Sequence, residues 1–442
     1  MSQNILNLAR ERDPGMKNVV CYGAKGDGVT DDTAAVQQAI NSENVVEFPD
    51  GTYLCGTLYL RDNTELKLSA KAVIMAIHDT NCYNQPDYCP QNRASKAEKA
   101  SGRHLISAVG VRNITIEGGC FDGDGVSWME RKHDFQPVWL PSPERPSQML
   151  FFCECKNIRI HNTRFQNASY WHCLFHGCED VQVSGVTVRG NHEILNDDGF
   201  DIDCCNHVEI KNCDIETGDD AIAIRGNPVP LTKPRPCENI HISDCKLFSA
   251  YATGVRIGVG DGEISDCLLE HLTITGAKTG FALVSKWGNG PNDGTRIHRI
   301  TVRDIQMSVK RPCLICLDNQ WANITNLSGA YSKDVLFENI RGQAAISGMI
   351  HGNGKGEIRD ITFRNMFLEF RGKGPAPTTD ETGLWCVEST DSMFEMSLTE
   401  NIRFEKTELS GKDCWKYELR DRDSKGLFCD NPAWRIDKAV KP

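Results

Sequence analysis

Three aspartates in two short acidic segments have the residue types and spacing that acid–base chemistry needs. Asp198 lies in the acidic segment 196–203, and Asp219 and Asp220 follow in the segment 217–225. Three carboxyl groups that lie close together repel one another, so at least one of them keeps its proton near neutral pH. A protonated carboxylic acid beside an ionised carboxylate is the pair that glycoside hydrolysis requires.

Two other interpretations of these aspartates stay open at this point. Aspartate is common in turns, where its side chain hydrogen-bonds its own backbone. Carboxylate oxygens also suit calcium. Among the cysteines, Cys313 and Cys316 have the two-residue gap of a metal site but no second pair of ligands follows them. We expect neither a metal nor a cofactor, because two carboxyl groups suffice for glycoside hydrolysis.

The elements that position the aspartates follow from an internal repeat. A polar residue followed by two apolar residues that alternate with a polar one recurs along the chain. The repeat starts at Asn113, Asn157, Asp180, His207, Asn239, His271, Arg299, Asp334, Asp360 and Asn401. Steps of roughly 23 to 35 residues are typical of stacked repeats, and each copy predicts a short strand with one buried face. The pattern predicts a parallel β-solenoid, with a β-propeller of longer repeat as the alternative.

Cysteines recur within this pattern. Cys213, Cys245 and Cys267 stand just before a strand in successive copies. A repeated position stacks on itself in a solenoid, so we expect an interior ladder of unbridged thiols.

The repeat predicts one elongated domain over residues 1–442. A cap segment at about 18–55 would precede coils at 56–410 and a C-terminal cap or tail at 411–442. A helix is predicted at 31–40, where it would cover the open end of the coil stack. Irregular polar segments at 85–103 and 131–147 are expected to be long loops on the binding side.

The composition excludes several classes of partner. The chain of 442 residues has a net charge of −11, with no Lys/Arg block. This balance argues against nucleic acid and anionic membranes, and no apolar run approaches the roughly 18 to 20 residues of a membrane span. The first residues lack the pattern of a secretory signal. We expect a cytoplasmic protein, or a secreted one if a signal has been removed.

Several motifs, in order along the chain, resemble glycoside hydrolase family 28, the polygalacturonase family of right-handed parallel β-helices. Residues 22–33 resemble the entry segment of many bacterial members, and 117–125 resemble the first full coil. The asparagine–threonine–aspartate motif is similar to 196–198, with Asp197 in place of threonine. The glycine–aspartate–aspartate motif matches 218–220. The resemblance implies a right-handed parallel β-helix with a short N-terminal capping helix.

The resemblance also implies roles for the aspartates. Asp219 would be the general acid, Asp198 and Asp220 would activate water, and the anomeric centre would invert. Two departures concern the substrate. Thr253 stands where the family has a histidine, and Val284 stands where it has the arginine of a cationic pair.

Further residues are candidates for substrate binding. Lys286 is the surviving member of the cationic pair, and Arg256 or Arg225 would supply the missing guanidinium. Asn196 belongs to the first aspartate motif, and His192 precedes it. The sugar-stacking candidates are Trp171 and Trp287.

The expected function is hydrolysis of α-glycosidic bonds in pectic, galacturonan-type poly- or oligosaccharides. Action from a chain end is expected if the loops at 85–103 and 131–147 close one end of the groove. A non-catalytic, tailspike-like carbohydrate-binding β-helix and a polysaccharide lyase are the alternatives. The expected partner is an acidic saccharide, and a homo-oligomer stays open.

Overall fold

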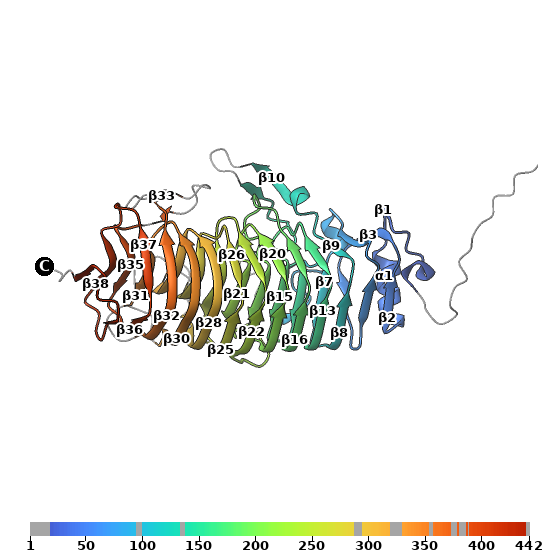
Figure 1. The fold of residues 1–442 in the computed structure, drawn as a ribbon. Helices are drawn as coiled ribbons and strands as arrows, with labels where there is room; N and C mark the ends of the chain where they lie inside the picture. The colour runs from blue at the N-terminus through green and yellow to red at the C-terminus, as the bar shows by residue number, and fades with distance from the viewer. Residues whose placement is uncertain are drawn as a thin grey trace, which may run out of the picture.

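The chain folds into a long stack of parallel strands, seen in a computed structural model (Figure 1). The structure describes residues 18–93, 100–132, 138–286, 294–318, 329–352, 357–372, 378–379, 386–387 and 389–438. Two large sheets dominate it, one of 23 strands (sheet A) and one of 13 strands (sheet B). Each coil of the chain contributes strands to both sheets, and the coils follow the right-handed sense that parallel crossovers take. The architecture is a right-handed parallel β-helix, as predicted.

Sheet B forms one face of the β-helix. Its strands, in order, are β4 (Leu58–Tyr59), β7 (Ile106–Val109), β12 (Leu150–Cys153), β15 (Cys173–His176), β18 (Phe200–Asp203), β21 (Ile222–Gly226), β24 (Thr253–Gly260), β27 (Thr279–Lys286), β29 (Arg311–Asp318), β31 (Gly348–His351), β35 (Ser392–Ser397), β38 (Tyr417–Arg422) and β40 (Ile436–Lys438). Neighbouring strands lie about 4.8 Å apart, so residues in register form rows along the stack.

Sheet A supplies two ladders that later merge. The first ladder contains β2 (Val45–Phe48), β5 (Glu65–Leu68), β8 (Arg112–Glu117), β13 (Lys156–His161), β16 (Glu179–Ser184), β19 (Asn206–Lys211), β22 (Cys237–Ser243) and β25 (Glu263–Glu270). The second contains β1 (Asp27–Asp31), β3 (Gly51–Cys55), β6 (Ala72–Ala76), β9 (Cys120–Asp122), β14 (Arg164–Gln166), β17 (Thr187–Arg189), β20 (Asp214–Thr217), β23 (Lys246–Ser249) and β26 (Thr273–Thr275).

The two ladders meet in β28 (Arg296–Val309), which pairs with both β25 and β26. The stack then continues through β30 (Tyr331–Ala344), β32 (Ile358–Phe370), β36 (Glu400–Glu405), β37 (Glu408–Gly411) and β39 (Phe428–Cys429). Two antiparallel hairpins stand outside these sheets. They are β10 (Met129–Lys132) with β11 (Trp139–Pro141), and β33 (Thr378–Thr379) with β34 (Cys386–Val387).

The repeat signature forms an interior ladder. Ile114, Ile158 and Val181 stack in register, and each is fully buried. The residues that start these copies, such as Asn113 and Asn157, have φ of 58°. Asparagine adopts this left-handed conformation at low cost, and the amide of Asn157 also donates to Oδ1 of Asn113 at 2.7 Å. The polar start of each copy therefore makes the corner between two faces.

One copy of the repeat was placed wrongly. The ladder passes from Ile240 to Cys267 and then to Ile300, so this coil begins at Asp266 and not at His271. His271 instead precedes β26 in the second ladder. Two strands of one coil show the same alternation, and the period alone does not say which face each belongs to.

The predicted stacking of cysteines is present for Cys213 and Cys245 but not for Cys267, and other cysteines stack in the same way. The backbone N–H of Cys213 lies 3.4 Å from Sγ of Cys245, and that of Cys178 lies 3.3 Å from Sγ of Cys205. Cys267 belongs to the isoleucine ladder instead. Every cysteine in the described part of the chain is unbridged.

The N-terminal end of the stack is covered by a helix. Helix α1 (Thr33–Ser42) covers the N-terminal end with Val36 and Ile40 fully buried (Figure 1), which confirms the predicted cap. Short 3₁₀ helices lie at Val19–Tyr22, Thr80–Cys82, Pro90–Asn92 and Gly125–Trp128. Parallel pairing begins before residue 56, with β1 and β2, and continues through β40; the division of the chain into caps and coils stays a prediction. No helix in the described residues has the length and apolarity of a membrane span.

Candidate active site

The three aspartates lie on consecutive turns that lead into sheet B. Asp198 stands two residues before Phe200 and Asp220 two residues before Ile222, and these two strand residues are in register. The N–H of Gly199 donates to the carbonyl oxygen of Asp220 at 3.0 Å, which locks the two turns together. Carboxylate oxygens of Asp198, Asp219 and Asp220 lie within 4.8 Å of one another. The structure therefore brings together the residues that the sequence predicted to share one patch.

Burial gives these carboxyl groups unusual proton affinities. Burial raises the pKa of Asp198 well above its usual value, and the charges of Asp219 and other neighbours raise it further. Burial, followed by the charge of Asp220, raises the pKa of Asp219 to about 7. Asp219 is the partly exposed member of the trio. Near neutral pH the site therefore holds a carboxylic acid that both reaches solvent and can give up its proton.

Arg256 and Thr253 hold Asp220. Nε of Arg256 lies 2.7 Å from Oδ2 of Asp220, and Nη2 lies 3.9 Å from Oδ2 of Asp198. The backbone N–H of Thr253 donates to Oδ1 of Asp220 at 3.0 Å. The two oxygens of Asp220 thus face the Arg256 guanidinium and the Thr253 backbone N–H. Thr253 is mostly buried, and its observed role is this backbone contact.

Arg225 is engaged elsewhere on the same sheet. Nη1 lies 3.6 Å from Oδ1 of Asp201, and Nε lies 3.5 Å from Oδ2 of Asp203. The guanidinium carbon lies 4.7 Å from the ring centre of Trp171. Arg225 and Trp171 are each only 4% exposed. They form a buried cation–π pair, which contradicts the predictions of a free guanidinium fork and of an exposed sugar-stacking face.

Two residues beneath the trio were missed as site residues. Asp197 is fully buried, its Oδ2 accepts the N–H of Gly218 at 3.2 Å, and its Oδ1 lies 3.4 Å from Nδ1 of His172. Nδ1 of His172 is also 2.9 Å from the carbonyl oxygen of Asp198. Burial raises the pKa of Asp197 and lowers that of His172 to about 4. This uncharged pair joins the two aspartate turns, and the only signal in the sequence was Asp197 at the motif's threonine position.

Arg145 fixes the turn on its other side. Its Nη1 donates to the carbonyl oxygens of Ser169 and Leu195 at 2.8 and 2.9 Å, and its Nη2 donates to Oδ1 of Asn196 at 3.0 Å. Asn196 thus has its side-chain oxygen bound within the protein, although it was predicted to bind substrate. Nothing local in the sequence marks Arg145 for this role.

Three other candidates lie apart from the trio or outside the described residues. His192 binds Glu216 at 2.9 Å and stacks on Phe248, both in the second ladder of sheet A. Lys286 ends β27, seven residues after Thr279, which is in register with Thr253; at 3.3 Å per residue it lies about 23 Å along the strand from the aspartate row. The structure thus does not bring His192 or Lys286 to the aspartates. Trp287 lies outside the described residues.

Val284, at the expected arginine position, is fully buried. It packs with Ala282 and Cys316 on the outer face of sheet B. The residue in register with Arg256 on β27 is Ala282. Among the described residues, Arg256 is therefore the guanidinium in contact with the trio.

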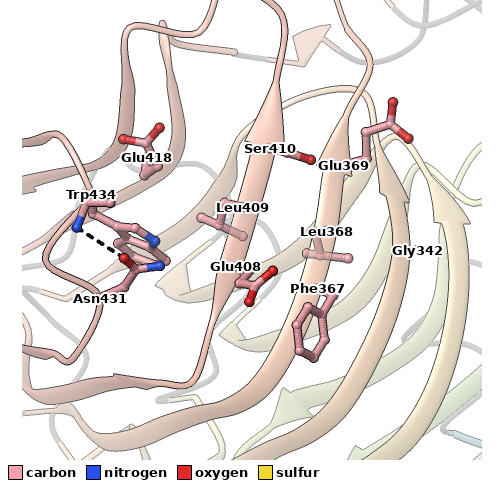
Figure 2. A pocket seen from close by; sticks show the side chains of 11 residues that line it. Gly342, Phe367, Leu368, Glu369, Glu408, Leu409, Ser410, Glu418, Asn431 and Trp434 are labelled. Atoms are coloured by element: carbon pink, nitrogen blue, oxygen red, sulfur yellow. Dashed lines mark hydrogen bonds between the residues drawn. The ribbon is translucent and has the colours of Figure 1, made fainter.

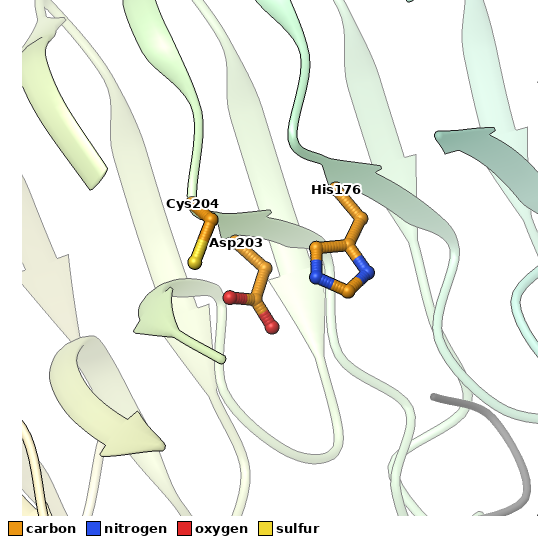
Figure 3. A group of neighbouring side chains, drawn as sticks. All are labelled: His176, Asp203 and Cys204. Atoms are coloured by element: carbon orange, nitrogen blue, oxygen red, sulfur yellow. The ribbon is translucent and has the colours of Figure 1, made fainter. Parts of the chain in front are cut away.

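A second group on the same strands has residue types that bind metals. His176, Asp203 and Cys204 offer ligand atoms within 4.8 Å of one another (Figure 3). Nε2 of His176 lies 2.9 Å from the carbonyl oxygen of Asn227, and Oδ1 of Asp203 accepts the N–H of Asn227 at 2.7 Å. A carbonyl only accepts, so Nε2 carries the proton and is not a free ligand. This group clamps the backbone of Asn227 and does not fit a metal.

The aspartate trio also fits a metal poorly. Arg256 already places a permanent positive charge against Asp220, and Arg256 cannot lose it. A divalent cation bound between the three carboxyl groups would face this guanidinium. The arrangement favours proton transfer over calcium binding.

The outer face of sheet B is covered on the N-terminal side of the aspartates. Leu231 packs there on Phe151, Trp171 and Leu174 in one buried cluster. The segment that carries Leu231 is anchored at Glu154, whose Oε1 accepts the N–H of Thr232 at 2.8 Å. These contacts place a loop between β21 and β22 over strands β12 and β15.

The predicted loop at 85–103 joins the same wall. The amide of Gln91 donates to Oε2 of Glu154 at 2.7 Å, and the guanidinium of Arg93 binds the carbonyl of Val229. On another side, the hairpin of β10 and β11 projects from the stack (Figure 1). Its Trp139 binds Glu193 through Nε1 at 3.0 Å. Both predicted loops therefore have described parts that flank the coils around the trio.

A hollow of about 470 Å³ near the C-terminus is acidic but differs from this site. Figure 2 shows Glu369, Glu408 and Glu418 on separate strands and spread around the hollow. Glu369 pairs with Arg371 and Glu418 with Arg435, each at 2.7 Å. The hollow lacks the close trio of carboxyl groups.

Comparison with known proteins agrees with the motifs. The pattern of Glycosyl hydrolases family 28 matches residues 57–382, and that of Rhamnogalacturonase A/epimerase, pectate lyase-like matches residues 16–82. Polygalacturonase-2 of Solanum lycopersicum is 25% identical over 358 residues, covering 77% of this chain and 72% of that protein. A probable polygalacturonase of Arabidopsis thaliana is 25% identical over 357 residues, covering 76% and 73%.

Solved structures share the fold. A family 28 exopolygalacturonase of Yersinia enterocolitica has a TM-score of 0.66 at 19% identity, covering 93% of this chain and 77% of that chain. An exopolygalacturonase of Thermotoga maritima has a TM-score of 0.61 at 18% identity, covering 81% and 88%. The family pattern spans most of the chain and includes both aspartate turns. The chain belongs to glycosyl hydrolases family 28.

Proposed function

We propose that this protein hydrolyses α-glycosidic bonds of pectic galacturonan or its oligosaccharides, acting from a chain end. The observation that carries the proposal is the convergence of Asp198, Asp219 and Asp220 within 4.8 Å, with Asp219 reaching solvent. Polygalacturonases among the relatives support the substrate class. A purely carbohydrate-binding β-helix has no use for a carboxyl trio held by Arg256, so binding alone is not favoured.

The chemistry divides between two kinds of carboxyl group. Asp219, whose pKa is raised to about 7, gives its proton to the glycosidic oxygen as the bond to the anomeric carbon breaks. A water oxygen bonds to the anomeric carbon, and its proton passes to a carboxylate of the Asp198–Asp220 pair. The Asp197–His172 pair and Arg145 hold the two turns in place during the reaction.

Inversion at the anomeric carbon is part of the proposal. The carboxyl oxygens of the trio lie within 4.8 Å of one another, which is closer than the separation of about 6.5–9.5 Å that is common in inverting glycosidases. Inversion is therefore inferred from the contacts of Asp220 and not from the carboxyl separation. Asp220 forms an ion pair with Arg256 through one oxygen and accepts the Thr253 N–H at the other, which suits a base for water better than a nucleophile toward carbon. Proton NMR of the first-formed product tests this. The inverted anomer supports a directly attacking water, and retention would require a covalent carboxylate ester.

Action from a chain end is supported by the wall over β12 and β15. Leu231, Glu154 and Gln91 cover the outer face of sheet B immediately before the aspartate turns. A polysaccharide lying along the rows of sheet B meets this wall at one end. A blocked groove accepts a terminus and excludes a chain that passes through.

The test is a time course on galacturonan labelled at its reducing end. Release of one short product size from the start, with slow loss of polymer length, supports the proposal. Early mid-chain fragments contradict action from a chain end, and absence of any cleavage contradicts hydrolysis. Asp219→Asn is the control, because it removes the proton donor and keeps the shape of the side chain. An unsaturated product, absorbing near about 235 nm, would indicate a lyase.

A further inference from the structure

The carboxyl groups of the trio outnumber the positive charges in contact with them. Three carboxyl groups lie within 4.8 Å of one another, and within the described part of the chain one guanidinium, that of Arg256, contacts them. Arg225, on the neighbouring strand, is already paired with Asp201 and Asp203. One positive charge in a buried site stabilises one carboxylate and leaves the others to take up protons.

The geometry selects which carboxylate is neutralised. Arg256 approaches Asp220 to 2.7 Å but Asp198 only to 3.9 Å, and the Thr253 N–H binds the second oxygen of Asp220. Asp198, by contrast, has no hydrogen-bond partner at Oδ1 in the described structure. Arg256 is in register with Ala223, three residues beyond Asp220 in the aspartate row, so its side chain must reach back to the turn. It is 12% exposed there.

We propose that Arg256 makes Asp220 the only base of the trio, while Asp198 serves as an uncharged group that orients the attacking water. Arg256 is then a positioning residue that acts through Asp220, and it does not bind the substrate carboxylate. This inference rests on the proposed function. It narrows the family expectation, in which Asp198 and Asp220 share the activation of water.

In this mechanism Asp220 receives the proton of the water and Asp219 gives its proton to the leaving oxygen. The water oxygen forms its bond to the anomeric carbon, and the released proton goes to Asp220. The glycosidic bond breaks toward its oxygen, which takes the proton of Asp219. Asp220 then returns its proton to solvent and Asp219 regains one, which restores the starting state.

Other titratable groups face the trio and contribute to its electrostatic environment. The groups that interact electrostatically with it are Arg145, Asp197, Asp201 and Tyr251, while Arg225 acts on Arg256 and His172 contacts the turn. Of these, Arg145 is held by carbonyl groups and Asn196, and Arg225 by its own aspartates. Changing Arg256 alone therefore alters the cation that contacts Asp220 among the residues that the structure describes.

The first experiment compares the pH dependence of kcat for the wild type, Arg256→Gln and Arg256→Lys on a short galacturonan oligosaccharide. Loss of the charge in Arg256→Gln makes Asp219 bind its proton more tightly, because the charge of Arg256 lowers the pKa of that carboxyl group in the wild type. We expect the basic limb of the pH profile to move upward, by roughly one to three pH units, with KM changed less than three-fold. Arg256→Lys keeps the charge, so its profile should stay in place while kcat falls.

The results that would overturn the inference differ from those that would overturn the proposed function. A profile that does not move, with KM raised ten-fold or more in Arg256→Gln, overturns the inference and makes Arg256 a substrate grip. A wild type that cleaves nothing overturns the proposed function together with the inference. Cleavage by the wild type with an unmoved Gln profile overturns the inference alone.

A second pair of variants decides the question if Arg256→Gln does not fold. Asp220→Asn removes the base and should lower kcat by about 10²- to 10⁴-fold. Asp198→Asn keeps an uncharged hydrogen-bonding group and should lower kcat by no more than about ten-fold. Equal losses in the two variants would overturn a single-base assignment. Thermal unfolding of each variant checks that the losses are not those of unfolded protein.

Discussion

Two arginine–carboxylate clusters share sheet B. The Arg256 cluster contains Arg256, Asp198, Asp219 and Asp220, and the Arg225 cluster contains Arg225, Asp201 and Asp203. In the second, the guanidinium lies between two carboxylates and against Trp171, and the Asn227 backbone binds Asp203. In the first, three carboxyl groups share one close guanidinium, and Asp219 is partly exposed.

The two clusters differ in how many carboxyl groups surround each guanidinium. The Arg225 cluster has its contacts closed by a ring face, a backbone amide and a covering loop, which is the arrangement of a buried structural ion pair. The Arg256 cluster keeps more acidic groups than one cation can neutralise. A surplus of carboxyl groups beside solvent produces the protonated acid that hydrolysis needs. Similar residues on adjacent rows thus serve stability in one place and chemistry in the other.

The largest effect is expected from removing the acid of the Arg256 cluster. Asp219→Asn cannot donate a proton to the leaving oxygen, so kcat should fall by about 10²- to 10⁴-fold. The fold should persist, because Asn fills the same space and can still accept the N–H of residue 220. Initial rates and thermal unfolding of the same preparation measure both quantities. A variant with near wild-type kcat would show that the proton comes from another group.

The matching change in the Arg225 cluster should act on stability. Arg225→Met leaves Asp201 and Asp203 buried without their guanidinium, and breaking a buried ion pair in this way costs about 3–5 kcal/mol of unfolding free energy. Chemical denaturation of the variant beside the wild type measures this loss. An undiminished stability with a raised KM would instead return Arg225 to the substrate-binding role predicted from the sequence.

The repeat made the fold and the trio predictable. Apolar alternation starting at Asn113 and Asn157 defines successive coils, and a coil spacing of about 4.8 Å places Asp198 beside Asp220. Both are consequences of local pattern and one repeated dimension. The slip at His271 marks the limit of that pattern, because two strands of one coil alternate identically.

The surroundings of the trio depend on contacts between distant segments. Trp171 is buried because Arg225 and Leu231 close over it, and Asn196 is occupied because Arg145 reaches it from another loop. Such contacts are set by the paths of loops, which carry no periodic signal. Sequence reasoning could therefore bring the three carboxyl groups together but could not say which of the two candidate arginines contacts them.

The pH dependence distinguishes the clusters by a smaller effect. The pKa of Asp219 is raised to about 7, chiefly by burial, so the acid form is present below that pH and is lost as pH rises through it. The basic limb of kcat should therefore lie near pH 7. A profile in Arg225→Met that keeps this limb would confirm that the Arg225 cluster does not set it. A limb far above pH 7 in the wild type would contradict the assignment of Asp219.

The smallest expected effect concerns the wall beside the Arg225 cluster. Glu154→Ala removes the acceptor for Thr232 and Gln91, so the loop that covers β12 and β15 should loosen at a cost of about 1–3 kcal/mol. Asp219 and its partners are untouched, so kcat on a short oligosaccharide should stay within about two-fold of the wild type. On long galacturonan, a looser wall should admit internal bonds and raise the share of mid-chain products. The matched control is Glu179→Ala, whose carboxylate pairs with exposed Lys156 on sheet A. If both variants give the same product pattern as the wild type, the wall does not set action from the chain end, and the terminus must be recognised within the Arg256 cluster itself.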